Sequence, residues 1–158
     1  MTKIQGDCNP ELELRFKRVA KDPNWPLPEY GSAEASGMDL RADLDEPVSL
    51  APGEIKLIPS GWSIAVPKGY EAQVRPRSGL ALRQGLTIIN TPGTIDSDYR
   101  GEMGLAMINL GKNEVVINRG DRLAQLIINK VERPKLVLIE ELDQTARGSG
   151  GFGSTGVG

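Results

Sequence analysis

Residues 62–75 read WSIAVPKGYEAQVR, and this stretch decides the class of fold. Apolar side chains alternate with polar or small ones from Trp62 to Val66, and again from Tyr70 to Val74. Alternation with a period of two is typical of a β-strand that buries one of its faces. Pro67 and Gly69 lie between the two segments and mark a turn, so the stretch predicts two successive strands.

The same pattern recurs along most of the chain. Further short segments rich in leucine, isoleucine and valine lie at 12–16, 103–107, 115–117, 123–128 and 136–139. Turn signals with proline or glycine separate them, at 51–53, 59–61, 91–93 and 118–121. Regularly spaced short strands of this kind predict an all-β protein, either a sandwich, a jelly roll or a barrel.

Three segments depart from the strand pattern. Residues 78–84 look like one short helix that ends at Gly85, and residues 20–35 contain three prolines and predict a surface loop. Residues 147–156, RGSGGFGSTG, are half glycine and are expected to be mobile without a ligand. We therefore expect one barrel domain over 1–145 and a flexible Gly-rich tail over 146–158.

Composition narrows the cellular setting. The chain has 158 residues, a net charge of −2 and no clustered basic face, which disfavours a nucleic-acid partner. Its single cysteine, Cys8, cannot form an intrachain disulfide, and no apolar run nears 18 residues. We expect a cytoplasmic protein with no membrane partner.

Histidine is absent from the sequence, and this excludes several kinds of catalytic site. Ser–His–Asp and Cys–His nucleophilic sites and H-E-x-x-H zinc sites all require an imidazole. An enzyme of this composition would use a carboxylate as its general base, and a hard cation held by oxygen atoms is favoured over zinc.

The tail contains two overlapping matches to G-x-G-x-x-G, at 148–153 and 151–156. A dinucleotide-binding fingerprint needs a strand before it and a helix after it, and here the chain ends instead. Phe152 still needs an explanation, because disordered termini usually lack large aromatic residues. We interpret the tail as a closing flap in which Arg147 and glycine amides bind phosphates while Phe152 stacks on a base, against the alternative of an inert terminus.

Three internal segments carry groups suited to a phosphorylated ligand. Arg77, Ser78 and Gly79 open the predicted helix and form a candidate anion site, with a simple N-cap as the alternative. Residues 85–102 place Asn90, Asp96 and Tyr99 in a hairpin-like loop, which could also be a plain polar turn. Gln125 interrupts an aliphatic strand and needs a polar partner, either a structural network or a ligand.

Taken together and in this order, the segments resemble the trimeric dUTPase family. Five motifs of that family have counterparts here, at 35–42 (ASGMDLRA), 76–81 (PRSGLA), 85–101, 120–127 (GDRLAQLI) and 147–156. The combination is far more specific than any single motif. The resemblance covers the chain from about residue 26 to its C-terminus.

The resemblance implies a function and a fold. Family members hydrolyse dUTP to dUMP and pyrophosphate by attack of water on the α-phosphorus, use Mg²⁺, and thereby lower dUTP and supply dUMP for thymidylate synthesis. They form a distorted jelly-roll β-barrel that assembles as a homotrimer with active sites at the subunit interfaces, where each tail closes over a neighbour's site.

The resemblance also implies a role for each matching residue. Asp96 corresponds to the residue that binds the 3′-hydroxyl and activates the attacking water, and Tyr99 to the ring beneath the deoxyribose. The uracil readers are Asn90, Thr94 and Ile95. The phosphate contacts are Arg77, Ser78, Gly79, Gln125, Arg147, Ser154 and Thr155, and Phe152 stacks on the base. Asp39 corresponds to a carboxylate near the water shell of the metal.

One residue departs from the common bacterial pattern, because Ser154 stands where several relatives carry histidine. Two other functions remain open. A dCTP deaminase or bifunctional deaminase shares the barrel but uses a glutamate base, whereas the hairpin here reads TIDSDY over 94–99. A non-catalytic nucleotide-binding module would be expected to have lost Asp96, Ser78 or the tail.

Overall fold

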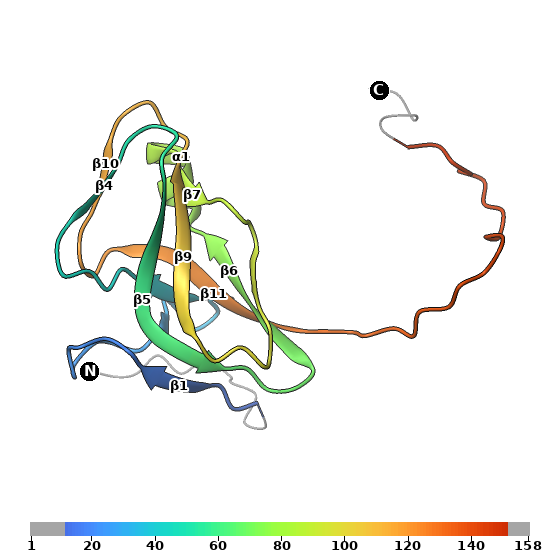
Figure 1. The fold of residues 1–158 in the computed structure, drawn as a ribbon, viewed down its shortest axis with the longest axis horizontal. Coiled ribbons are helices and arrows are strands. Elements are labelled where there is room, and N and C mark those ends of the chain that lie inside the picture. The colour runs from blue at the N-terminus through green and yellow to red at the C-terminus, as the bar shows by residue number, and fades with distance from the viewer. Residues whose placement is uncertain (1–11, 152–158) are drawn as a thin grey trace.

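The structure is a computed structural model, and it describes residues 12–151. Three β-sheets contain almost all of its regular structure (Figure 1). The first sheet has the order β1-β5-β9-β7, the second β10-β4 and the third β2-β3-β11-β6-β8, and all the strand pairs are antiparallel. The strands are β1 (Arg15–Arg18), β2 (Glu29–Tyr30), β3 (Met38–Arg41), β4 (Val48–Leu50), β5 (Ile55–Ala65), β6 (Tyr70–Pro76), β7 (Leu86–Ile88), β8 (Gly93–Ile95), β9 (Glu102–Asn109), β10 (Val115–Ile117) and β11 (Arg122–Lys130).

The expected class of fold, all-β with one short helix, is confirmed. The helix α1 (Ser78–Gln84) has the predicted bounds, and it ends at Gly85, whose φ of 68° is the left-handed conformation that glycine adopts without strain. Within residues 12–151, no helix is long and apolar enough to cross a membrane.

The core lies between the sheets and is almost entirely aliphatic, as the low aromatic content requires. Its fully buried apolar side chains come from all three sheets: Leu40, Leu50, Ile58, Ile64, Leu86, Met103, Leu105, Met107, Ile117 and Leu126. The alternation in β9 follows the prediction, since Met103, Leu105 and Met107 are buried while Gly104 is exposed. Burial of this kind supplies most of the favourable free energy of folding.

Three sequence-based expectations need correction. Residues 136–139 form no strand, because they lie in an arm that leaves the barrel after Val131, whose amide donates to the carbonyl of Gly69 (2.9 Å; Figure 1). The first strand is β1, three residues later than the predicted segment 12–16, because it pairs with β5 from Ala65 to Trp62. Residues 20–35 are not all surface, since they include β2 and the buried Trp25.

Asn109 is a fully buried polar side chain of the core, and its amide group is satisfied on both sides. Its Nδ2 donates to the carbonyls of Leu50 (2.9 Å) and Asn113 (2.8 Å), and its Oδ1 accepts from the amide of Gly111 (2.9 Å). These bonds join β4 and β9 to the loop that leads to β10. A buried polar group of this kind is costly to leave without partners.

We therefore expect Asn109→Ala to lower the free energy of unfolding by about 3 kcal/mol, because three backbone groups lose their partner inside the protein. Urea unfolding followed by circular dichroism measures this change. Asn113→Ala is the matched control, since the bond uses the backbone carbonyl of Asn113 and its side chain is exposed. Equal stability of the two variants would contradict the assignment.

Candidate active site

A small cavity opens between the two large sheets, among β6, β7, β8 and β9. Its volume is about 160 Å³, and four of the predicted site residues line it: Asn90, Thr94, Ile95 and Tyr99. Sites for drug-sized ligands usually measure several hundred Å³, so this hairpin cavity suits a single ring and not a whole nucleotide. Its wall is apolar where Val74, Ile88 and Met103 contribute, which suits a flat base.

Glycine shapes the hairpin cavity at two positions. A Cβ atom at Gly93 would lie 3.3 Å from Nδ2 of Asn90, so glycine leaves the amide its place beside β8. A Cβ atom at Gly101 would overlap the hydroxyl group of Tyr99. Both glycines are needed because another side chain approaches their backbone closely.

Two hydrogen bonds hold Tyr99, one through its side chain and one through its backbone. Its hydroxyl donates to the carbonyl of Glu102 (2.9 Å), and its amide donates to the carbonyl of Asp96 (3.1 Å). The tyrosine ring therefore lies across the loop 96–102 at the mouth of the cavity. This loop follows directly from β8, which pairs with β6.

Asp96 lies one residue beyond the end of β8, and its side chain is exposed. It does not line the hairpin cavity. It lines a neighbouring hollow of about 490 Å³ together with Lys68, Tyr70 and Arg133. Its carboxylate therefore lies open to solvent, where a substrate and a water molecule can reach it.

A second group of residues, all but one of them predicted, lies near Asp39, whose side chain in β3 is almost fully buried. We call Asp39, Arg77, Ser78, Arg122 and Gln125 the charged cluster. Asp39 Oδ2 accepts from Arg122 Nη1 at 2.9 Å, and its Oδ1 lies 3.3 Å from Arg77 Nε. The second contact is an ion pair by distance but lacks hydrogen-bond geometry, so Oδ1 has no hydrogen-bond partner within residues 12–151.

The register of the sheet explains why this group forms. Gln125 in β11 lies opposite Asp39 in β3 on one side and opposite Arg75 in β6 on the other. Arg77 follows β6 directly, and its Nη1 also donates to the carbonyl of Arg122 (3.2 Å). The charged cluster therefore results from the central position of β11.

The structure contradicts the simple N-cap alternative for Ser78. Arg77 occupies the N-cap position of α1, and no side chain caps the helix. Ser78 is the first helical residue, so its hydroxyl group does not serve as the cap.

Arg122 is a site residue that the sequence analysis missed. It stands inside the segment 120–127 that drew attention to Gln125, but its partner Asp39 is 83 positions away. Only the pairing of β3 with β11 brings the two together. The sequence did contain one indication of Arg122, which is a charged residue at the start of a mostly aliphatic strand.

The two groups do not meet within one copy of the chain. Ile95, next to Asp96, pairs with Ala72 near the start of β6, whereas Arg77 follows the end of β6 at Pro76. Four residue steps lead from Ala72 to Pro76, which is about 13 Å of strand. Asp96 and the charged cluster therefore lie at different places along β6, with the pair of Gly93 and Val74 between them.

The predicted tail contacts fall on or beyond the last described residues. Arg147 is exposed, and its Nε donates to the carbonyl of Gly150 (2.8 Å), so it touches neither group of site residues. Phe152, Ser154 and Thr155 lie outside the described residues.

Magnesium was expected near Asp39, and the donor groups there suit an ion that keeps its water. Within residues 12–151, no three His, Cys, Asp or Glu side chains are placed to hold a metal ion together. Mg²⁺ commonly binds through one or two carboxylates, several waters and substrate phosphates. The free Oδ1 of Asp39 can accept a hydrogen bond from such a water.

Comparisons with curated proteins give a uniform result. A family model described as dUTPase matches residues 23–156. A deoxyuridine 5′-triphosphate nucleotidohydrolase from Caldanaerobacter subterraneus subsp. tengcongensis is 56% identical over 146 residues, which is 92% of this chain and 99% of the relative. One of the same name from Caulobacter vibrioides is 52% identical over 148 residues, which is 92% and 96% of the two chains.

Solved structures agree with this result. A dUTPase variant from Staphylococcus bacteriophage 80alpha, solved with dUpNHpp, has a TM-score of 0.82 and 27% identity over 92% of this chain and 99% of its own. A dUTPase variant from phage phi11 of S. aureus, whose structure concerns a structural Mg(II) ion, has a TM-score of 0.73 and 26% identity over 82% and 97%. The expected jelly-roll type of fold is thereby confirmed, and this chain belongs to the dUTPase family.

Proposed function

We propose that this chain is a dUTP diphosphatase, which hydrolyses dUTP to dUMP and pyrophosphate by attack of water on the α-phosphorus. The observation that carries the proposal is the hairpin cavity of about 160 Å³, which suits one pyrimidine ring and is lined by Asn90 and Tyr99. The names of the curated relatives support the same substrate.

Base selection follows from the narrowness of the hairpin cavity. Asn90 presents an amide, and the backbone of Thr94 and Ile95 presents further donors and acceptors to the edge of uracil. Cytosine would leave these polar groups without partners, which is the strongest way a site can reject a ligand. Tyr99 lies beneath the deoxyribose and excludes a ribose 2′-hydroxyl.

The charged cluster binds the phosphates. Arg77, Ser78, Gly79 and Gln125 supply donors for the phosphate oxygens, and Arg77 is oriented by its ion pair with Asp39. Mg²⁺ bound with the substrate neutralises phosphate charge, which is the main requirement of phosphoryl transfer. Asp39 contributes through its free Oδ1 to the water shell of that ion and not as a direct ligand.

Asp96 acts as the general base and binds the 3′-hydroxyl of the sugar. Its position just after β8 connects it to the same loop as Tyr99, so the carboxylate and the ring approach the sugar from one element. A carboxylate suits this task in a chain without histidine.

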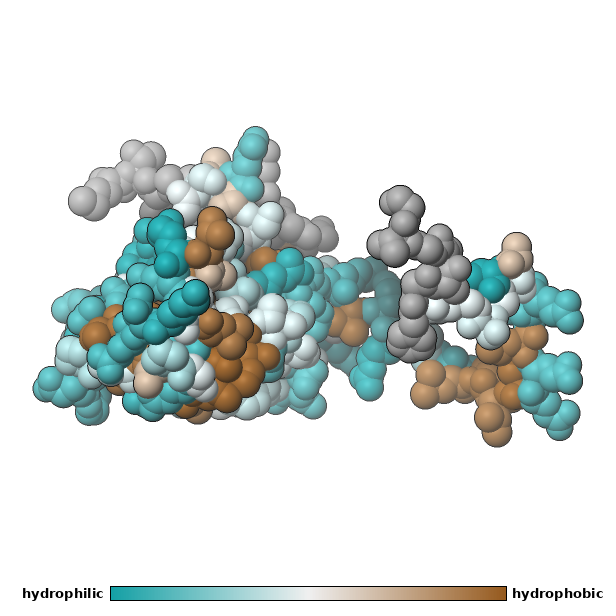
Figure 2. Space-filling view, turned by 90° about the horizontal axis from the view of Figure 1, so that it is seen from above, coloured by the Kyte–Doolittle hydropathy of each residue, from teal (hydrophilic) through white to brown (hydrophobic). Residues whose placement is uncertain are grey.

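The separation of the two groups along β6 supports a homo-oligomer whose sites combine copies. A homotrimer, as in the resemblance, would place the hairpin of one copy beside the charged cluster of another. The arm 132–151 supports the same proposal, because it leaves the barrel with exposed apolar side chains (Figure 2). These are Leu136, Val137, Leu138, Ile139 and Leu142. Exposed apolar surface of this extent is typical of an interface.

We further propose that residues 1–145, which comprise the barrel and the first part of the arm, form one domain and that residues 146–158 form the closing flap. Arg147 contacts the γ-phosphate, Phe152 stacks on the base, and Ser154 and Thr155 add phosphate contacts. Closure excludes water from the reacting groups and aligns the attacking water.

A pyrophosphate-release assay over the deoxynucleoside triphosphates, with and without Mg²⁺, tests the proposed function, and Asp96→Asn tests the base. The wild type should prefer dUTP, and Asp96→Asn should bind dUTP but turn over about 10²–10⁴-fold more slowly, because an amide cannot accept the proton. Release of ammonia from dCTP would favour a deaminase instead. A variant with more than half the wild-type rate would rule out Asp96 as the base.

Mixing variants tests whether sites combine copies. Asp96→Asn and Arg77→Gln should each be nearly inactive alone. Co-refolded in equal amounts, they should recover about a quarter of wild-type activity, because that fraction of shared sites has both native residues. The control mixture is Asp96→Asn with the double variant, which has no complete site. Equal, negligible activity of both mixtures would mean that each site lies within one copy.

Truncation tests the flap. Deletion of residues 147–158 should leave a barrel with the wild-type melting temperature and little catalysis, because the deleted residues contact the substrate and not the core. Circular dichroism and the pyrophosphate assay measure the two properties. A truncated protein that melts much earlier than wild type would show that the tail is structural.

A further inference from the structure

The ladder between β5 and β9 contains a bulge close to the hairpin cavity. Pro59 pairs with Gly104 and Ser63 with Glu102, so four residue steps on β5 face only two on β9. At the bulge, Gly61 adopts a φ of 76°, and its amide has lost its place in the ladder. This amide instead donates a hydrogen bond to the carboxylate of Glu102, with Oε1 2.8 Å from the nitrogen.

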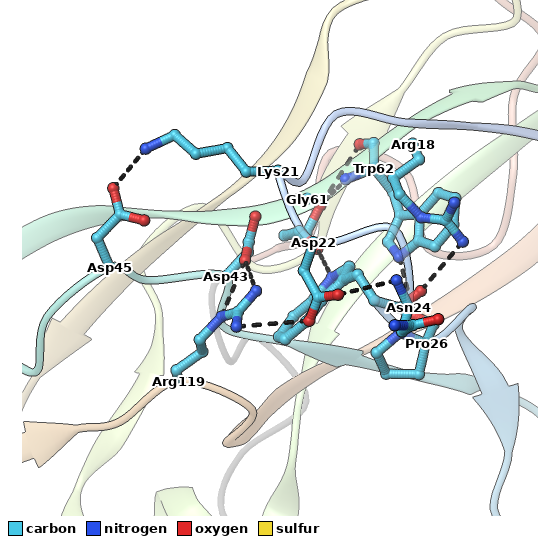
Figure 3. Close-up of polar contacts among 12 residues, drawn as sticks. Arg18, Lys21, Asp22, Asn24, Pro26, Asp43, Asp45, Gly61, Trp62 and Arg119 are labelled. Atoms are coloured by element: carbon cyan, nitrogen blue, oxygen red, sulfur yellow. Dashed lines mark hydrogen bonds and ion pairs between the residues drawn. The ribbon is translucent and has the colours of Figure 1, made fainter.

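An N-terminal clasp, residues 18–26, holds the bulge from the other side (Figure 3). The amides of Val19 and Ala20 both donate to the carbonyl of Gly61, at 2.9 and 3.0 Å. The indole nitrogen of Trp25 donates to the carbonyl of Ser60 (2.9 Å), and a Cβ atom at Gly61 would lie only 2.7 Å from it. The clasp therefore packs directly on the backbone that Glu102 binds.

Arg119 fixes the clasp to the barrel. Its guanidinium lies over the ring of Trp25, 4.8 Å from the centroid, and pairs with Asp43 (3.1 Å) and Asp22 (3.6 Å; Figure 3). The indole nitrogen of Trp62 donates to the carbonyl of Pro26 (3.0 Å) at the other end of the clasp. The bulge is thus held by the clasp, and the clasp in turn is fixed by two ion pairs and a cation–π contact.

Glu102 connects this bulge to the candidate active site. Its side chain binds the bulge, whereas its backbone carbonyl accepts the hydroxyl of Tyr99 (2.9 Å). Glu102 also lines the hairpin cavity together with Tyr99. One residue therefore has its side chain fixed by the barrel and its main chain in contact with the ring at the cavity mouth.

We propose that Glu102 is a positioning residue, which through the Gly61 bulge sets the Tyr99 ring and so determines how strongly the site prefers deoxyribose to ribose. This inference rests on the proposed function, in which Tyr99 lies beneath the sugar. Tyr99 is 45% exposed, so packing alone constrains its ring weakly, and the hydroxyl contact with Glu102 limits its motion. A ring excludes a 2′-hydroxyl only while it is held in place.

Three variants and a double variant test the inference, with the ratio of kcat/KM for dUTP to that for UTP as the readout. Glu102→Asp keeps the charge but is too short to reach the Gly61 amide, and Tyr99→Phe removes the hydroxyl. Each should lower the ratio about threefold to tenfold, the effect of losing one hydrogen bond. Glu102→Gln keeps an acceptor oxygen and should stay near the wild-type ratio.

The double variant Glu102→Asp/Tyr99→Phe distinguishes positioning from general weakening. Because both single changes act on the same ring, the double variant should lose no more discrimination than Tyr99→Phe alone. Glu46→Asp, at an exposed glutamate remote from the cavity, is the control for a carboxylate shortened by one methylene. An unchanged ratio in Glu102→Asp or in Tyr99→Phe, additive losses in the double variant, or a loss in Glu102→Gln as large as in Tyr99→Phe would each overturn the inference.

A second route remains if Glu102→Asp does not fold. Trp25→Phe removes the indole donor to Ser60 while it keeps an aromatic ring under Arg119, and it should lower the same ratio. A folded Trp25→Phe protein with the wild-type ratio would overturn the inference. Failure of the proposed function is distinguishable, since wild-type protein would then release no pyrophosphate from dUTP at all.

Discussion

Strand β11 lies at the centre of the five-stranded sheet, and its register with β3 and β6 determines where the charged cluster forms. The register sets Gln125 between Asp39 and Arg75, and it brings Arg122 onto the buried carboxylate of Asp39. Arg77 completes the arrangement because β6 ends beside the start of β11. A slip by one residue would turn every one of these side chains to the other face of the sheet.

A buried carboxylate is stable only when it is paired, and the pairing of Asp39 has a functional consequence. Two arginines compensate one carboxylate, so the cluster keeps net positive charge where the phosphates are proposed to bind. The hairpin that lines the cavity between the sheets is built in a different way. It uses glycine at 93 and 101 to bring Asn90 and Tyr99 close to a narrow cavity between the sheets. The phosphate site and the base site that we propose are thus built on separate elements.

This division is the basis for the proposal that each site combines copies of the chain. Asp96 follows the residue that pairs with Ala72, whereas Arg77 follows Pro76, so the two groups are attached to different parts of β6. The arm after Val131 and the bulge at Gly61 differ in how many contacts they make with the rest of the chain. The arm exposes leucine and isoleucine to solvent, whereas the bulge is held by Trp25, Arg119 and Glu102. The arm is suited to contact with another copy, and the bulge to constant geometry within one.

The sequence by itself determined the class of fold, the bounds of α1 and the five motifs, because alternation, turn residues and motif order are local properties of the chain. It also identified Asn90, Thr94, Ile95 and Tyr99, which the structure brings to one cavity. It did not identify Arg122 or Glu102, and it wrongly assigned a strand to 136–139. The reason is physical, since Asp39 meets Arg122, and Gly61 meets Glu102, only through pairing of strands far apart in the chain. Likewise, an extended apolar segment becomes a strand only when an edge is available to pair with it, and tertiary structure alone decides that.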